Sequence, residues 1–108
     1  MKKKLSSLLS LCRKAGFLSP GETGCEKALR SHSAKLIIIA ENASENTRKK
    51  FINKAFYYNT PVIIVGSKDD IARAIGAKTT ASVAVTNEGM ARKIIAEAGV
   101  LYSSALKT

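Results

Sequence analysis

The sequence predicts an α/β fold, organised as a three-layer α/β/α sandwich. Amphipathic helical segments alternate with short aliphatic segments along the chain, and no linker or repeat interrupts them. A chain of 108 residues with 45% hydrophobic content is long enough to form one domain with a buried core. Helices between consecutive strands imply crossover connections, so we expect helices on both faces of a largely parallel sheet.

The first third of the chain predicts two helices and a strand. Apolar side chains between residues 5 and 12 recur at helical spacing, and Gly16 ends this first helix. A turn at Pro20 and Gly21 leads into a second helix over residues 22–31. Residues 35–40 are almost entirely aliphatic, which is typical of a strand buried on both faces.

The rest of the chain continues the alternation. Ser44 and Ser67 are expected as helix N-caps, and Pro61 blocks continuation of the third helix. The expected elements are helix 44–58, strand 62–66, helix 68–75 after the Ser67 cap, strand 82–86 and helix 87–98. We expect a single domain over residues 1–99 and assign no structure to the tail at 100–108.

The charge balance indicates a nucleic-acid partner. The chain has 18 Lys and Arg residues against 8 Asp and Glu residues, a formal net charge of +10, and a basic excess of this density is typical of proteins that bind nucleic acid. No apolar run approaches the roughly 20 residues needed to cross a bilayer. The basic N-terminus lacks an apolar region and cleavage site like those of a signal peptide. We therefore expect a cytoplasmic protein with no membrane partner.

The residues that could support catalysis are few and scattered. His32 is the one histidine, lies in a predicted turn and has no acid beside it. Cys12 and Cys25 fall on apolar helix faces, where we expect buried structural thiols. Asp69 and Asp70 favour complementation of a helix dipole. Glycine-rich dinucleotide and NTPase motifs are absent, so we expect no enzyme, no catalytic residue, no metal and no cofactor.

The order and spacing of several segments resemble the superfamily of ribosomal proteins that bind kink-turn RNA, such as archaeal L7Ae and eukaryotic L30e. The segments are residues 21–44, 57–65, 71–76 and 82–89. The similarity extends over about residues 5–95, and residues 40–47 are most similar to the bacterial YlxQ-like branch. The resemblance implies a four-stranded mixed sheet, with an additional short strand near residues 17–19. It also implies a ribosomal-type RNA-binding protein that recognises kinked RNA.

The candidate interface combines helix chemistry with this resemblance. A helix start at Gly21 offers unpaired amides to an anion. The family carries a Gly-x-Asn-Glu-x-x-Lys pattern there, which Gly21 and Lys27 match, whereas Thr23 and Gly24 stand in place of Asn and Glu. Amides and cations are expected to bind phosphates, and polar side chains to test base edges exposed by the kink. The expected RNA-binding residues are Gly21, Glu22, Thr23, Gly24, Lys27, Arg30, Lys35, Asn42, Ser44, Lys78, Thr79 and Thr80.

Two alternatives remain open from the sequence. The same fold could serve as a protein-interaction module for the ribosome or translation factors, through Lys49, Lys50 and Lys54. An RNA-processing enzyme is the other alternative. The expected partner is structured RNA, ribosomal or another kink-turn RNA, with the ribosome as a further partner and a monomeric state.

Overall fold

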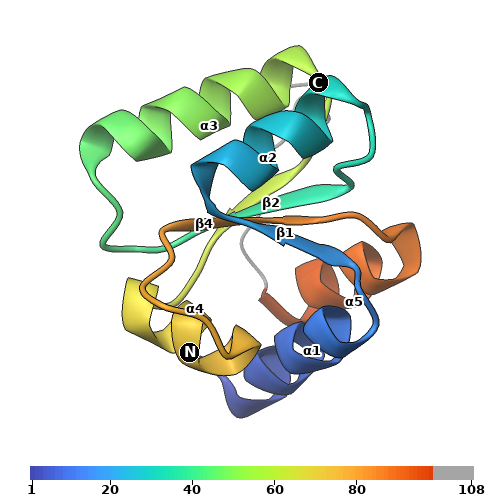
Figure 1. Cartoon of the computed structure of the whole chain (residues 1–108), viewed down its shortest axis with the longest axis vertical. Coiled ribbons are helices and arrows are strands. Elements are labelled where there is room, and N and C mark those ends of the chain that lie inside the picture. The colour runs from blue at the N-terminus through green and yellow to red at the C-terminus, as the bar shows by residue number, and fades with distance from the viewer. Residues whose placement is uncertain (99–108) are drawn as a thin grey trace.

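The computed structural model describes residues 1–98, which form five helices and four strands in alternation (Figure 1). The expected tail at residues 100–108 lies outside these residues. The elements are α1 (Lys3–Lys14), β1 (Leu18–Pro20), α2 (Gly21–Arg30), β2 (Leu36–Ile39), α3 (Glu45–Tyr57), β3 (Val62–Ile64), α4 (Lys68–Ile75), β4 (Ser82–Val85) and α5 (Glu88–Ala98). The short strand implied by the family resemblance is therefore present as β1.

The four strands form one sheet in the order β1-β4-β2-β3. Helices α2 and α3 cover one face, and α1, α4 and α5 cover the other (Figure 1), so the three-layer α/β/α sandwich is confirmed. The sheet is mixed, as the resemblance implied: β2 and β3 are parallel, whereas β4 is antiparallel to β1 and to β2.

The expectation of a largely parallel sheet is wrong. Ile39 at the end of β2 pairs both with Ile64 at the end of β3 and with Ser82 at the start of β4. Strand β4 therefore begins at the same edge where β3 ends. The eight-residue helix α4 and the loop after it return the chain to that edge, instead of crossing to the opposite one.

The core lies on both faces of the two central strands. Every residue of β2 and β4 is buried, because each side of these strands is covered by helices. Cys12 and Cys25 are both 0% exposed, which confirms them as core residues on the apolar faces of α1 and α2. Among residues 1–98 no helix is long and apolar enough to cross a membrane.

Candidate nucleic-acid interface

One edge of the sheet gathers segments that are far apart in the sequence. Pro20 at the end of β1 pairs with Val83 near the start of β4, and β2 and β3 end at this edge too. We call this region, at the left of Figure 1, the Gly21 edge. It comprises residues 21–24, 41–44, 66–68 and 77–81. Neighbouring strands lie about 4.8 Å apart, and β4 lies between β1 and β2. The ends of β1 and β2 are therefore about 10 Å apart at this edge.

The start of α2 has no side-chain cap among the described residues. Its N-cap is Pro20, which has no side-chain acceptor, whereas Ser44 caps α3 and Ser67 caps α4. Gly21 turns the chain into α2 with φ +83°, a conformation that glycine adopts without steric cost. The first amides of α2 are thus available at the positive end of the helix dipole, where an anion is favoured.

Gly24 permits a close approach between α2 and β1. A Cβ atom at this position would lie 2.9 Å from Ser19 Oγ and 3.0 Å from the Ser19 carbonyl carbon. The Ser19 hydroxyl donates a hydrogen bond to the Gly24 carbonyl (3.2 Å) across the same contact. The family's glutamate has no room here, which gives a physical reason for its replacement by glycine.

The side chain of Glu22 is directed toward α3. Its carboxylate accepts a hydrogen bond from the Thr47 hydroxyl (3.2 Å) and lies 3.7 Å from Lys50 Nζ. Thr23, the next residue, is exposed. Glu22 therefore joins α2 to α3, whereas the exposed side chain of Thr23 is the one suited to contact a ligand.

Asn42 and Ser44 follow β2 and are both exposed, but each also supports the local structure. The Asn42 side-chain oxygen accepts a hydrogen bond from the Lys68 amide (2.8 Å), which connects the ends of the two parallel strands. Ser44 accepts from the Thr47 amide (3.2 Å) as the N-cap of α3. Asn42 uses its oxygen in this contact, so its amide nitrogen is the group suited to donate to a ligand.

The loop before β4 brings Lys78, Thr79 and Thr80 to the Gly21 edge. Lys78 and Thr79 are exposed. Thr80 is 8% exposed, and its hydroxyl donates to the Lys78 carbonyl (2.8 Å). Thr80 therefore holds the loop, while Lys78 and Thr79 present their side chains to solvent.

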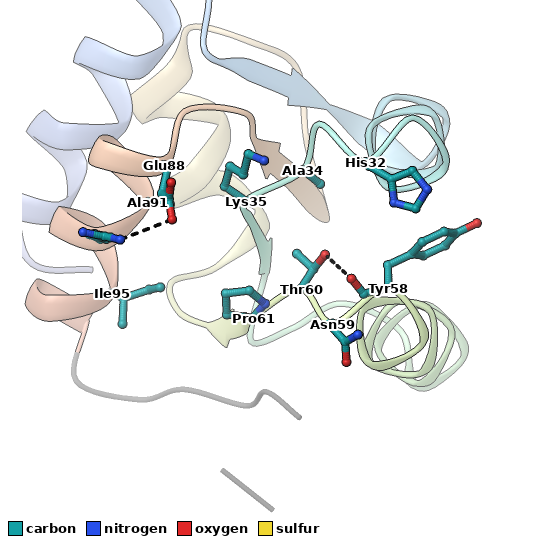
Figure 2. Close-up of a pocket in the computed structure, with 11 residues that line it drawn as sticks. His32, Ala34, Lys35, Tyr58, Asn59, Thr60, Pro61, Glu88, Ala91 and Ile95 are labelled. Carbon is teal, nitrogen blue, oxygen red and sulfur yellow. Dashed lines mark hydrogen bonds and ion pairs between the residues drawn. The ribbon is translucent and has the colours of Figure 1, made fainter. Parts of the chain in front are cut away.

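The remaining predicted residues do not lie at this edge. Arg30 is nine residues along α2, about 13 Å from Gly21 by helix rise. Lys27 and Arg30 line an open groove of ≈ 500 Å³ beside β1. Lys35 precedes β2 at the opposite edge and lines a separate cavity with Tyr58 (Figure 2). The structure thus divides the predicted residues between two regions joined by α2.

Two cations were missed by sequence reasoning, one within the Gly21 edge and one beside it on α3. Lys68 begins α4 directly after β3, and Arg48 lies one turn into α3, its amide bonded to the Ser44 carbonyl. The Arg48 Nε atom is buried and has no hydrogen-bond partner among residues 1–98. The signal for Lys68 was available, because the carboxyl ends of parallel neighbouring strands meet at one edge.

The lysines of α3 that suggested a protein-interaction module are paired with carboxylates. Lys49 lies 3.0 Å from Glu45, and Lys54 lies 3.6 Å from Glu26. Lys50 also pairs with Glu26, and its hydrogen bond lowers the pKa of that carboxyl from its ordinary value. Lys50 and Lys54 thus tie α3 to α2, which weakens the case for a charged docking face on α3.

The described residues contain no group of three or more His, Cys, Asp and Glu side chains that could hold a metal ion. The Gly21 edge offers backbone amides, the ammonium groups of Lys68 and Lys78, and several hydroxyls, beside the carboxylates of Glu22 and Glu41. Such a set can bind phosphates and test base edges.

The chain has a small α/β/α fold in which an uncapped helix start meets three polar loops at one edge. The chain belongs to the ribosomal protein L7Ae/L30e/S12e/Gadd45 family, whose model matches residues 3–95. It falls in the YlxQ-like bacterial branch: RNA-binding protein YlxQ of Bacillus subtilis (strain 168) is 40% identical over 88 residues, 82% of this chain and 88% of that protein. The protein of the same name from Enterococcus faecium is 34% identical over 92 residues, 85% of this chain and 88% of that one. The family and branch indicated by the sequence are confirmed.

Solved structures share the fold. A protein of unknown function from Bacillus halodurans C superposes with a TM-score of 0.87 at 32% identity, over 92% of this chain and 100% of that one. A 15.5 kDa RNA binding protein from Giardia lamblia gives a TM-score of 0.74 at 17% identity, covering 92% and 91% of the two chains. The YlxQ relatives are named as RNA-binding proteins, and neither name describes an enzyme.

Proposed function

We propose that this chain binds RNA, and that the Gly21 edge recognises a kinked, structured RNA. Support for RNA binding comes from the YlxQ relatives, which are named as RNA-binding proteins, and from the net charge of +10. The observation that carries the choice of site is the uncapped start of α2, which opens onto the edge where three polar loops meet.

Affinity in this proposal comes mainly from phosphate contacts. The first amides of α2 hold a phosphate oxygen, and Lys27, Lys68 and Lys78 supply charge along the α2 groove and the edge. These contacts fix the position of the RNA without reading its sequence.

Specificity comes from the exposed polar side chains of the loops. Thr23, Asn42 and Thr79 face the solvent at the Gly21 edge and can donate to or accept from base edges. The deep groove of regular A-form RNA is too narrow for side chains to read, so these contacts require bases opened by a kink. Gly24 contributes no base contact, which leaves Thr23 as the polar residue of the helix start.

The test is a titration of the protein with a kink-turn RNA and with a regular duplex of equal length at one salt concentration. We expect the kink-turn RNA to bind at least about tenfold more tightly, because only the kinked RNA exposes base edges. Equal affinity for the two RNAs would contradict recognition of a kink and leave only charge-driven binding.

A matched pair of variants locates the site. Lys78→Ala removes an exposed cation of the Gly21 edge, and Lys93→Ala removes an exposed cation of α5, a helix that contributes no residue to that edge. We expect only Lys78→Ala to weaken binding of the kink-turn RNA. Sedimentation of the complex tests the further proposal of one protein monomer per RNA.

The cellular setting belongs to the same proposal: a cytoplasmic protein acting on ribosomal or other kink-turn RNA. Co-sedimentation with ribosomes in a cell extract, lost in Lys78→Ala, supports the ribosomal target. Recovery of other structured RNAs after crosslinking would instead identify a target outside the ribosome.

A further inference from the structure

The end of the molecule opposite the Gly21 edge carries an aromatic surface. It forms where α2 and α3 end beside each other, and we call it the Tyr58 surface: Arg30, His32, Lys35, Tyr57 and Tyr58. The Tyr57 and Tyr58 rings meet edge to face, with centroids 4.9 Å apart. The His32 ring meets Tyr58 in the same manner at 5.6 Å. Tyr57 is 79% exposed, so a large aromatic ring is held by its neighbour yet remains in solvent.

His32 has an unusual backbone conformation and packs its ring against Tyr58. His32 follows the end of α2 with φ +60°, a conformation that glycine adopts most readily. Its amide donates to the Leu29 carbonyl (3.0 Å), which closes the last turn of the helix. A histidine at this position carries a conformational cost, and its ring lies against Tyr58.

Two hollows meet at Tyr58. One, of ≈ 400 Å³, lies between His32, Lys35 and Tyr58 on one side and Arg92 and Ile95 of α5 on the other (Figure 2). The other, of ≈ 280 Å³, lies between α2 and α3 and is lined by Arg30 and both tyrosines, among others. The larger hollow is within the size range of small-ligand sites, roughly 300–1,000 Å³.

The carboxylate that lines the larger hollow is already paired, because Glu88 lies 3.3 Å from Arg92, so the remaining charge beside the rings is positive. Lys35 is exposed and forms no ion pair within residues 1–98. Arg30 lies 3.9 Å from Glu26, a loose contact, and Glu26 is already held by two lysines of α3. Exposed rings beside cations are the combination that binds single-stranded nucleic acid, because bases stack on the rings and phosphates pair with the cations.

We propose that the Tyr58 surface binds an unpaired nucleotide that flanks the kinked element of the same RNA. The base stacks on Tyr57, and Lys35 and Arg30 hold the adjoining phosphates. The groove beside β1, lined by Lys27, Arg30 and Thr86 among others, leads from the middle of α2 toward this surface and provides the path for the strand. This inference rests on the proposed RNA binding, but it assigns a second site about one α2 length away from the Gly21 edge.

The test compares three kinds of RNA by fluorescence anisotropy: a kink-turn hairpin, the same hairpin with an unpaired extension of eight nucleotides, and a duplex of equal length. The extension is placed at the 5′ and the 3′ end in turn. We expect one extended hairpin to bind the wild-type protein at least about fivefold more tightly than the plain hairpin. Tyr57→Ala and Lys35→Ala should each remove most of that gain.

Leu11→Ala is the matched control, because Leu11 is another exposed large side chain (55%) and lies on α1, across the sheet. It should keep the full gain. Tyr57→Phe should also keep it, since the ring remains. Thermal melts verify that each variant is folded. We expect the fold to be kept, because Tyr57 and Lys35 are exposed.

The outcomes separate the two proposals. If the kink-turn hairpin is preferred over the duplex but neither extension adds affinity, or Tyr57→Ala keeps the gain, the second site is refuted and the Gly21 edge stands. A surface for a protein partner would give that same pattern. If Tyr57→Ala removes the gain while hairpin and duplex bind equally, the second site stands and kink recognition fails. Absence of binding to all three RNAs refutes both.

Discussion

Substitution of Gly24 by alanine tests how closely α2 approaches β1. The new Cβ atom would lie 2.9 Å from Ser19 Oγ, 3.0 Å from the Ser19 carbonyl carbon and 3.1 Å from its oxygen. Two of these three atoms belong to the backbone of a paired strand, so α2 itself must shift. Overpacking of this kind costs about 1–3 kcal/mol. Alanine returns about 1 kcal/mol through its higher helix propensity, and we expect a net destabilisation of about 1 kcal/mol.

Urea unfolding at 25 °C measures this difference in the free energy of unfolding. Gly89→Ala is the matched control, because a Cβ atom there would meet only the Asn87 side-chain oxygen, at 3.3 Å. That variant should be neutral or slightly stabilised. The double substitution Ser19→Ala with Gly24→Ala should recover only part of the loss, since the backbone contacts remain. If Gly24→Ala proves as stable as Gly89→Ala, the close approach of α2 to β1 is not a constraint, and our reason for the missing glutamate fails.

Three further predictions concern reactivity, pH and salt. Burial raises the pKa of the Cys25 thiol to about 12, so an alkylating reagent should modify it at a rate limited by unfolding, and rapid modification of the folded protein would refute this. Hydrogen bonds from Ser67, the backbone amide first, lower the pKa of Asp70 from its ordinary value of 3.8. The stability from this capping box is therefore present above pH 3.8 and is lost as the pH falls through the lower folded-state pKa of Asp70. The melting temperature of Asp70→Asn should accordingly fall less in acid than that of the wild type. If about four cations bind phosphates, the logarithm of RNA affinity should fall against the logarithm of salt concentration with a slope of about −3, and a slope near zero would exclude phosphate-driven binding.

The helices and central strands could be predicted because their signals are local. Ser67 with Asp70 forms the expected start of α4, and Gly76 ends it with φ +66°. The strand β1 has only three residues, too few for a periodic pattern, so only the family resemblance indicated it. The direction of β4 could not be predicted, because it depends on where the loop after α4 leads.

The candidate site was predictable in part for the same reason. The helix start at Gly21 is visible in the sequence, since glycine after proline precedes an amphipathic segment. Lys35 lies before the start of β2, at the opposite edge of the sheet from Gly21 at the start of α2. This separation could not be predicted without knowing the order and direction of the strands. The use of Glu22 by α3 depends on Thr47 and Lys50, contacts between two helices that no local pattern encodes.

The most direct test of the account compares Lys27→Ala with Lys54→Ala in binding to one kink-turn RNA at one salt concentration. Both side chains are lysines on helices of the same face of the sheet, but Lys27 is exposed on the groove of α2 and forms no ion pair within residues 1–98, whereas Lys54 is paired with Glu26. We expect Lys27→Ala to cost about 1–3 kcal/mol of binding free energy, as charge-assisted contacts do. Lys54→Ala should cost less than about 0.5 kcal/mol. A larger loss for Lys54→Ala would place the RNA on α3 and contradict the assignment of the interface to α2 and the Gly21 edge.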